Sequence, residues 1–261
     1  MTQRLQDRVV VVTGGGSGIG RGACLRAAQE GARVVVADIR LELARSVAQE
    51  ILAEGGVAIA VACDVAAEEQ VQALVQTTVD EFGSIWGMVA NAGTAGSGWI
   101  HETTITDWQF VLGVNLTGPF LCAKYSLPHM MVAGGSFIVT SSIAGSVVGA
   151  GGAAASYTVS KHGVLGLVKQ IAVDYGQYGV RANAIQPAAV QDTRLAMHAA
   201  EDQAHATTPK AALPRPKAWL PIHRAGKSRE EYGATIAFLL SDDAGYVTGT
   251  SVPVDGGYLA T

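Results

Sequence analysis

The chain has 261 residues, enough for one large domain, and 49% of them are apolar while only 15% are charged. With 32 glycines, this composition suits an α/β domain built on a buried parallel sheet. The net charge of −4 and the lack of a Lys/Arg run argue against a nucleic-acid partner. No apolar stretch reaches the roughly 20 residues that a transmembrane helix needs, which argues against a membrane protein.

The three cysteines, Cys24, Cys63 and Cys122, are far apart and have no spacing typical of metal ligands. We therefore expect reduced, mostly buried thiols and no metal site. The polar residues 1–8 run straight into a strand and do not resemble a signal peptide. Together these features predict a cytoplasmic protein.

The first predicted element is a buried strand at residues 9–13, a β-branched run. It leads directly into Gly14-Gly15-Gly16-Ser17-Gly18-Ile19-Gly20, and a helix follows that ends at Gly31. Glycines between a strand and a helix let backbone N–H groups approach a pyrophosphate, which the helix N-terminus also attracts. The spacing is not the strict G-x-G-x-x-G, and a bare glycine run could also be a flexible loop.

Residues 33–38 form the second predicted strand, which Asp38 ends about 20 residues after the glycine turn. A carboxylate there accepts hydrogen bonds from the ribose hydroxyls of NAD and repels the 2′-phosphate of NADP. Capping of the next helix is the alternative role, and both can hold. Arg40 stands nearby and could soften the discrimination against NADP.

Helices and strands then alternate. We predict helices at residues 40–54 and 68–82 and strands at residues 57–62 and 85–90. Asp64 lies where an adenine ring would bind, although N-capping of the following helix is at least as good a role on spacing alone. Asn91-Ala92-Gly93 follows the fourth strand, and such small residues let a cofactor lie close to the backbone.

A long helix is predicted at residues 106–131, in which Pro119 could introduce a bend. Asn115 lies in its interior, where an Asn is mildly unfavourable and could simply face solvent. The fifth strand, at residues 137–140, delivers Ser141-Ser142 at its carboxyl end, where ligands bind in open α/β sheets.

The helix at residues 157–178 has an apolar stripe that we interpret as a packing face. It opens with Tyr157 and Lys161, which share one helix face because they are four residues apart. An ammonium group so close lowers the pKa of a phenol from about 10, so that it can exchange protons with an alcohol or carbonyl oxygen. Tyr-x-x-x-Lys also occurs by chance in surface helices; Ser141-Ser142 and the glycine turn give the pair its weight.

A sixth strand at residues 180–185, ended by Pro187, a helix at residues 230–240 and a strand at residues 251–254 complete the chain. No linker or repeat divides it. We therefore predict a single α/β domain over residues 1–261, a Rossmann-like doubly wound parallel sheet of about seven strands with helices on both faces.

The motifs together resemble those of classical short-chain dehydrogenases/reductases, in the same order and over essentially the whole chain. They are Thr13-Gly14-x-x-x-Gly18-x-Gly20, Asn91-Ala92-Gly93, Asn115, Ser142, Tyr157-x-x-x-Lys161 and Thr248-Gly249 with Pro253-Val254-Asp255-Gly256-Gly257. Each motif alone is weak, whereas six in order at compatible distances are highly specific.

The resemblance implies that Tyr157 is the general acid/base, that Ser142 orients the substrate oxygen and that Lys161 lowers the pKa of Tyr157 and binds the nicotinamide ribose. Asn115 would hold a water in a proton relay to Lys161. Family members are usually tetramers and sometimes dimers, so the resemblance also implies a homo-oligomer, with a homotetramer as the expected form. The implied cofactor contacts are Gly14, Ser17, Gly18, Ile19, Gly20, Asp38, Asp64, Val65, Asn91, Ala92, Gly93, Tyr157, Lys161, Pro187, Val190 and Thr193.

The chain departs from the family pattern in three places. The interval from Ser142 to Tyr157 is a couple of residues longer than in many members, because of an insertion at residues 149–152. The Pro-Gly after the sixth strand is Pro187-Ala188, and the threonine that binds the carboxamide is displaced by one residue, to Thr193.

The sequence thus favours an NAD-dependent oxidoreductase that interconverts a secondary alcohol and a ketone. An NADP-dependent carbonyl reductase of the same fold is the nearest alternative. A non-catalytic NAD-binding protein is another, but such proteins often lose the Tyr or Lys that this chain keeps. Trp99, Met197 and Trp219 suggest an apolar substrate pocket, and ordinary packing explains them about as well.

Residues 188–227 lose periodicity and contain four prolines, and an irregular segment this long in a compact domain is usually functional. We predict a substrate lid that NAD and substrate order. Limited proteolysis tests this, because exposed mobile loops are cut first. Cleavage should concentrate near Lys210, Arg215 and Lys217 and slow when NAD is added; equal resistance with and without NAD would contradict the lid.

Overall fold

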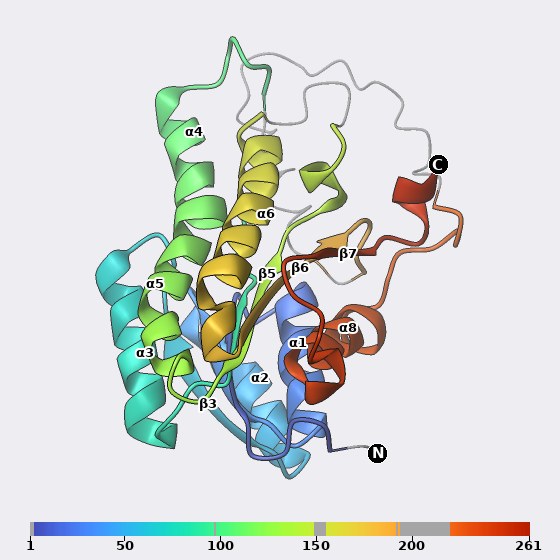
Figure 1. Ribbon diagram of the computed structural model, residues 1–261. Coiled ribbons are helices and arrows are strands. Elements are labelled where there is room, and N and C mark those ends of the chain that lie inside the picture. The colour runs from blue at the N-terminus through green and yellow to red at the C-terminus, as the bar shows by residue number, and fades with distance from the viewer. Residues whose placement is uncertain (1–2, 97, 149–154, 192, 194–219) are drawn as a thin grey trace.

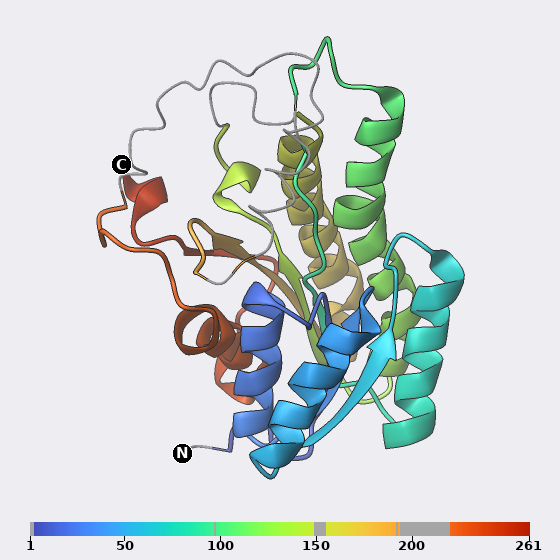
Figure 2. The same cartoon turned by 180° about the vertical axis from the view of Figure 1, so that it is seen from behind.

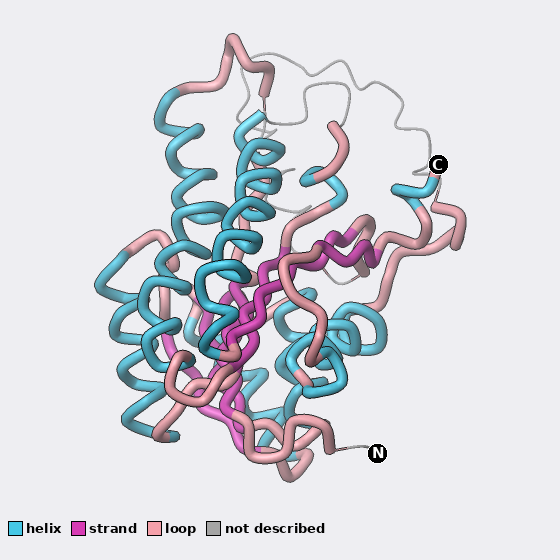
Figure 3. Tube along the Cα trace, viewed as in Figure 1, coloured by secondary structure: helices cyan, strands magenta, loops and turns pink. Residues whose placement is uncertain are grey.

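The computed structural model describes residues 3–96, 98–148, 155–191, 193 and 220–261. Its centre is one sheet of seven strands in the order β3-β2-β1-β4-β5-β6-β7. All neighbouring strands run parallel. The strands pass through the middle of the domain with helices on both sides (Figure 3). The predicted doubly wound α/β fold is thereby confirmed.

The strands lie close to where the sequence predicts them. Side chains alternate between the two faces, so that Val10 and Val12 join one core cluster and Val11 the other. All three are fully buried because helices cover both faces of the sheet. The bounds are β1 (Val9–Thr13), β2 (Arg33–Asp38), β3 (Val57–Ala62), β4 (Gly87–Ala90), β5 (Gly135–Thr140), β6 (Val180–Pro187) and β7 (Ser251–Val254).

Helices form a layer on each face of the sheet (Figures 1 and 2). The layer in front in Figure 2 contains α1 (Gly18–Gln29) and α2 (Leu41–Ala53), and α8 (Ala234–Leu240) packs into the same core cluster. The opposite layer contains α3 (Glu68–Phe82), α5 (Gly118–Met130) and α6 (Ala155–Tyr175). The apolar stripe of α6 packs against the sheet, as predicted.

The long helix predicted at residues 106–131 forms, and its α-helical hydrogen-bonding pattern changes in the middle. It consists of α4 (Ile105–Leu112), a π-helical turn at Gly113–Thr117 and α5. Pro119 lies in the first turn of α5, where a missing N–H costs little. The π turn directs Asn115 inward, where it is 1% exposed, so the alternative that Asn115 faces solvent is wrong. Single π turns inside helices are frequent at functional sites.

The helix predicted at residues 230–240 also begins with a π-helical turn, at Ser228–Gly233. This turn docks on α1 through two glycines. A Cβ atom on Gly22 would lie 2.3 Å from the Ser228 carbonyl oxygen, and one on Gly233 would lie 2.5 Å from the Gly22 carbonyl oxygen. Any larger side chain at either position would separate the two elements.

The three cysteines are free and buried, as predicted. Among the described residues, no cluster of His, Cys, Asp or Glu side chains is placed to hold a metal ion. No helix in the described part of the chain is long and apolar enough to cross a membrane. Most of the predicted lid, at 192 and 194–219 with Met197 and Trp219, lies outside the described residues, as does the insertion at 149–152.

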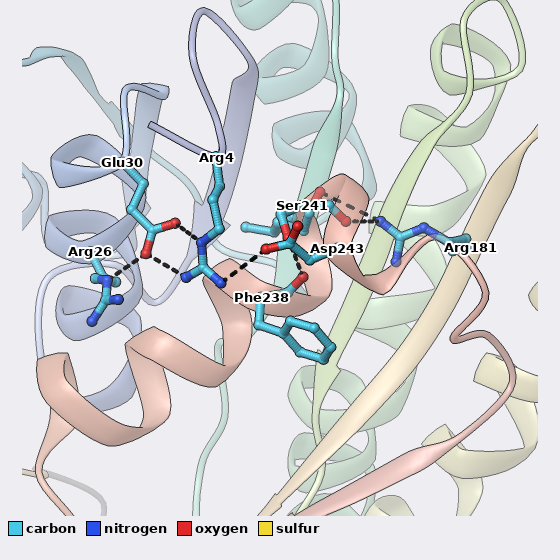
Figure 4. A network of polar contacts seen from close by, with 8 residues as sticks. Arg4, Arg26, Glu30, Arg181, Phe238, Ser241 and Asp243 are labelled. Carbon is cyan, nitrogen blue, oxygen red and sulfur yellow. Dashed lines mark hydrogen bonds and ion pairs between the residues drawn. The ribbon is translucent and has the colours of Figure 1, made fainter. Parts of the chain in front are cut away.

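Glu30, at the end of α1, joins the first residues of the chain to the rest of the domain (Figure 4). Its carboxylate accepts hydrogen bonds of 2.6 Å from Arg4 Nε and Nη2 and from Arg26 Nε. Arg4 also pairs with Asp243, beyond α8. Burial acts to raise the pKa of Glu30, but the hydrogen bonds from Arg4 and Arg26 outweigh it and leave the pKa below its ordinary value.

We predict that Glu30→Gln lowers the free energy of unfolding at pH 7 by about 1–3 kcal/mol, because the charged hydrogen bonds are lost. A carboxyl group with a lowered pKa stabilises the fold above its unfolded pKa of about 4.3, and this contribution is lost as the pH falls through the folded pKa. In urea unfolding, the difference in the free energy of unfolding between the wild type and Glu30→Gln should therefore shrink below pH 4.

Asp7→Asn is the matched control. Asp7 pairs with Arg33 at 3.1 Å, its side chain is 63% exposed, and its φ of +59° is one that Asn also adopts. Exposed pairs contribute little, so this variant should unfold like the wild type. Equal losses in the two variants would contradict the role of Glu30.

Candidate active site

The turn between β1 and α1 depends on glycines for its backbone conformation and for its close packing. Gly14 and Gly18 have φ angles of +62° and +52°, which disfavour any other residue. A Cβ atom on Gly20 would lie 2.1 Å from the Gly14 carbonyl oxygen. The first turn of α1 contains no acidic residue, so its N–H groups and dipole are available to an anion such as a pyrophosphate.

Asn91, just after β4, holds the glycine turn in place. Its Nδ2 donates to the carbonyl oxygens of Thr13 at 3.0 Å and Gly14 at 3.3 Å, and its Oδ1 accepts from Thr140 Oγ1 at 3.0 Å. The Thr13 hydroxyl accepts from the backbone N–H groups of Asn91 and Ala92. One polar network thus joins the carboxyl ends of β1, β4 and β5.

Asp38 is 6% exposed and lies against the same turn. Its Oδ2 accepts from the Gly16 N–H and its Oδ1 from the Arg40 N–H, each at 3.0 Å. The first bond ties the carboxylate to the glycine turn and the second supports the entry to α2, so Asp38 serves both elements. Because both oxygens are anchored, the negative charge has a fixed position.

Asp64 does not cap α3, whose N-cap residue is Ala67, so this alternative is wrong. A two-residue turn separates Asp64 from the cap, and its Oδ1 accepts instead from the Ala66 N–H at 2.9 Å. The neighbouring Val65 is 4% exposed and packs in the core next to Gly118. The expected adenine contacts of both residues stay predictions.

Asn115 connects the loop after β4 with α6. Its Oδ1 accepts from the Thr94 N–H at 2.8 Å, and its Nδ2 donates to the Thr94 carbonyl oxygen at 2.9 Å and to Ser160 Oγ at 3.2 Å. A Cβ atom on Gly93 would lie 3.3 Å from Asn115 Oδ1 and 3.6 Å from Lys161 Nζ. A side chain at Gly93 would therefore crowd both groups.

Ser142, Tyr157 and Lys161 come together where β5 ends and α6 begins. Ser142 Oγ accepts from the Ala144 N–H at 3.1 Å, and the Ser142 side chain acts to lower the pKa of Tyr157. Lys161 Nζ donates to the Thr140 carbonyl oxygen at 2.8 Å and lies 5.6 Å from the centre of the Tyr157 ring. The four predicted catalytic residues thus lie at one edge of the sheet.

Burial dominates the protonation of this pair. It lowers the pKa of Lys161 to about 8 and raises the pKa of Tyr157, a shift that the Ser142 side chain opposes. The net shift of Tyr157 is opposite to the predicted lowering. The reason is that Lys161 Nζ bonds to the Thr140 carbonyl oxygen, while desolvation disfavours the charged forms of both side chains.

The loop after β6 carries the remaining predicted cofactor contacts. Pro187 is buried and pairs with Val254 of β7. Val190 forms a parallel bridge with Gly226, so the loop has a fixed base. Thr193 stands between residues that the structure does not describe, and its role stays a prediction.

The sequence reasoning missed the roles of Thr13, Thr140 and Ser160. Thr13 and Thr140 each end a strand and bind Asn91, and Ser160 connects Asn115 with the Tyr157 carbonyl oxygen. The sequence did contain a signal for Thr13 and Thr140, because each is a hydroxyl residue that ends a strand at the edge where ligands bind.

A doubly wound sheet with a glycine turn at its carboxyl edge defines a dinucleotide-binding protein. The family described as Enoyl-(Acyl carrier protein) reductase matches residues 14–259. The chain belongs to the short-chain dehydrogenase/reductase family, whose members bind a nicotinamide cofactor, NAD or NADP.

Relatives match over nearly their full length. Levodione reductase from Leifsonia aquatica is 39% identical, with 99% of this chain and 97% of the relative covered. Cyclohexanol dehydrogenase from Acinetobacter sp. (strain SE19) is 37% identical with the same coverage. The crystal structure of a levodione reductase superposes with a TM-score of 0.89 at 37% identity, covering 99% of this chain and all of that one.

Proposed function

We propose that this chain is an NAD-dependent oxidoreductase that interconverts a secondary alcohol and a ketone. The observation that carries the proposal is the meeting of Ser142, Tyr157 and Lys161 at the sheet edge that also holds the glycine turn. The network through Thr140 and Asn91 connects these two parts. The relatives named dehydrogenase and reductase support the same reaction class.

The residues around the glycine turn suit a dinucleotide. Its glycines let the turn pack closely against the neighbouring backbone and side chains, and the N-terminus of α1 offers N–H groups to a pyrophosphate. We propose that Asp38 binds the adenosine ribose, that Asp64 and Val65 contact adenine, and that the loop after β6 contacts the nicotinamide. When bound, the nicotinamide ring accepts the hydride from the alcohol carbon or returns one to the ketone. The other proposed contacts are those expected from the sequence.

The side chains supply the proton chemistry. Ser142 orients the substrate oxygen, and Tyr157 takes the hydroxyl proton during oxidation and returns it during reduction. Lys161 keeps its charge below about pH 8, so its ammonium group can favour the phenolate at neutral pH. Asn115, which lies next to Gly93 as Lys161 Nζ does, would hold a water in the proton relay to Lys161.

We propose that the substrate carries its alcohol or ketone on a six-membered ring. Relatives named cyclohexanol dehydrogenase and cis-4-hydroxycyclohexanecarboxylate dehydrogenase, the second 39% identical over 263 residues, support this class. Trp99, which is 44% exposed in the loop after β4, offers an apolar surface for such a ring.

We also propose a homotetramer in the cytoplasm. The three free thiols support a reducing compartment. Exposed apolar side chains on the neighbouring helices α4, α5 and α6 support contacts between subunits. They are Phe110, Phe120, Val159 and Val173. A light-scattering mass equal to that of one chain would contradict the tetramer.

With cyclohexanol and NAD, the wild type should produce NADH, followed by its absorbance. In Tyr157→Phe, kcat should fall by roughly 10²–10⁴-fold, because the ring keeps its packing and only the proton donor is lost. NAD binding should survive, as measured by protein fluorescence.

Tyr175→Phe, near the other end of α6, is the matched control and should keep wild-type turnover. Near-normal turnover of Tyr157→Phe would show that Tyr157 is not the acid/base. No turnover by the wild type with any secondary alcohol would favour the non-catalytic alternative.

NAD should exceed NADP in kcat/KM, because a 2′-phosphate would meet the fixed carboxylate of Asp38. One such clash of like charges should discriminate by about 1–3 kcal/mol. Asp38→Ser should reduce the ratio of kcat/KM for NAD to kcat/KM for NADP. Glu42→Gln, which removes a carboxylate from the first turn of α2, should leave this ratio unchanged. A wild type that prefers NADP would show the interpretation of Asp38 to be wrong and would point to Arg40.

A further inference from the structure

Gln186 is a buried amide beneath the turn that carries Ser142. It is the last residue but one of β6 and is 2% exposed. Its Nε2 donates to the Ser142 carbonyl oxygen at 3.2 Å and to Ser146 Oγ at 2.6 Å. Both donors of the amide nitrogen therefore bind the two ends of one short turn.

The sheet register explains how Gln186 reaches this turn. Thr140 of β5 pairs with Ile185 of β6, and the Ser141 N–H donates to the Ile185 carbonyl oxygen. Side chains alternate along β6, and Ala182 and Ala184 belong to the core cluster on the α6 side. Gln186 lies on that same side, below the point where the chain leaves β5 and turns toward α6.

A buried amide costs free energy unless its groups are hydrogen-bonded, so an apolar side chain would be the simpler way to fill the space. Gln186 adds two anchors to the backbone that follows β5. The position of the Ser142 hydroxyl is then fixed in two ways: it accepts from the Ala144 N–H, and Gln186 binds the backbone carbonyl oxygen of Ser142 itself.

We propose that Gln186 is a positioning residue for the reaction, which keeps the Ser142 hydroxyl aligned with the Tyr157 hydroxyl. The inference rests on the proposed function, in which both hydroxyls act on one substrate oxygen. A displacement of about 1 Å in such an arrangement can lower the rate by about 10²-fold. Gln186 itself is too deeply buried to contact the substrate.

The test is Gln186→Met, which keeps the length and volume of the side chain but has no hydrogen-bond donor. We expect kcat for cyclohexanol oxidation to fall by about ten- to hundredfold. KM for NAD and the affinity for NADH, measured by its fluorescence, should stay within about twofold of the wild type, because Gln186 does not bind the glycine turn or Asp38. An unchanged kcat, or equal changes in kcat and in NADH affinity, would overturn the proposal.

A double-mutant cycle with Ser142→Ala separates positioning from a general loss of structure. If Gln186 acts through the Ser142 hydroxyl, Gln186→Met should change the residual kcat of Ser142→Ala by less than about twofold. If the double variant instead lost kcat by the product of the two single-variant factors, the proposal would be overturned.

Ser146→Ala removes one of the two hydrogen bonds that Gln186 makes to the turn. Because Ser146 is exposed, this variant should fold even if Gln186→Met does not. It should lower kcat by a smaller factor, and this loss should also vanish in the Ser142→Ala background. If neither loss appears, the proposal is wrong.

The matched control is Ser136→Ala, which removes a buried 2.8 Å hydrogen bond to the Leu239 carbonyl oxygen at the opposite end of β5. It should lower the Tm and leave kcat unchanged. A wild type without alcohol turnover would remove the proposed function and this inference together, whereas an active wild type with a normal Gln186→Met kcat would remove this inference alone.

Discussion

All seven strands run in the same direction, and their carboxyl ends therefore share one edge of the sheet. Helices cover both faces, and in such open α/β sheets ligands bind at the carboxyl edge. The glycine turn follows β1, Asp38 ends β2, Asn91 follows β4 and Ser142 follows β5. These residues are far apart in the sequence, but they meet because each lies at the carboxyl end of a parallel strand.

The same edge has to satisfy many buried polar groups, since an unpaired donor or acceptor there would cost free energy. Thr13, Asn91 and Thr140 solve this by binding one another and the neighbouring backbone. Lys161 joins the network through the Thr140 carbonyl oxygen. The bonds that make burial tolerable are thus the bonds that fix the glycine turn relative to Tyr157, so stability and the geometry of the site depend on the same contacts.

Burial also opposes the charged forms of the two central side chains of the site, Tyr157 and Lys161. Desolvation raises the pKa of Tyr157 and lowers that of Lys161, and each shift favours the neutral form. The proposed chemistry needs the opposite state, a phenolate beside an ammonium group. Ser142 is the group whose side chain already opposes the shift of Tyr157, which gives the position of its hydroxyl particular weight.

The sequence by itself determined the order of helices and strands, the glycine turn and the shared helix face of Tyr157 and Lys161, because these follow from local periodicity and spacing. Only the tertiary structure decided that a π turn brings Asn115 inward, that Asp64 leaves α3 uncapped and that Thr13 and Thr140 bind Asn91. The direction of the pKa shift of Tyr157 was also decided only by the tertiary structure. Burial and hydrogen-bond partners come from neighbours in space, and the spacing of residues along a chain does not contain them.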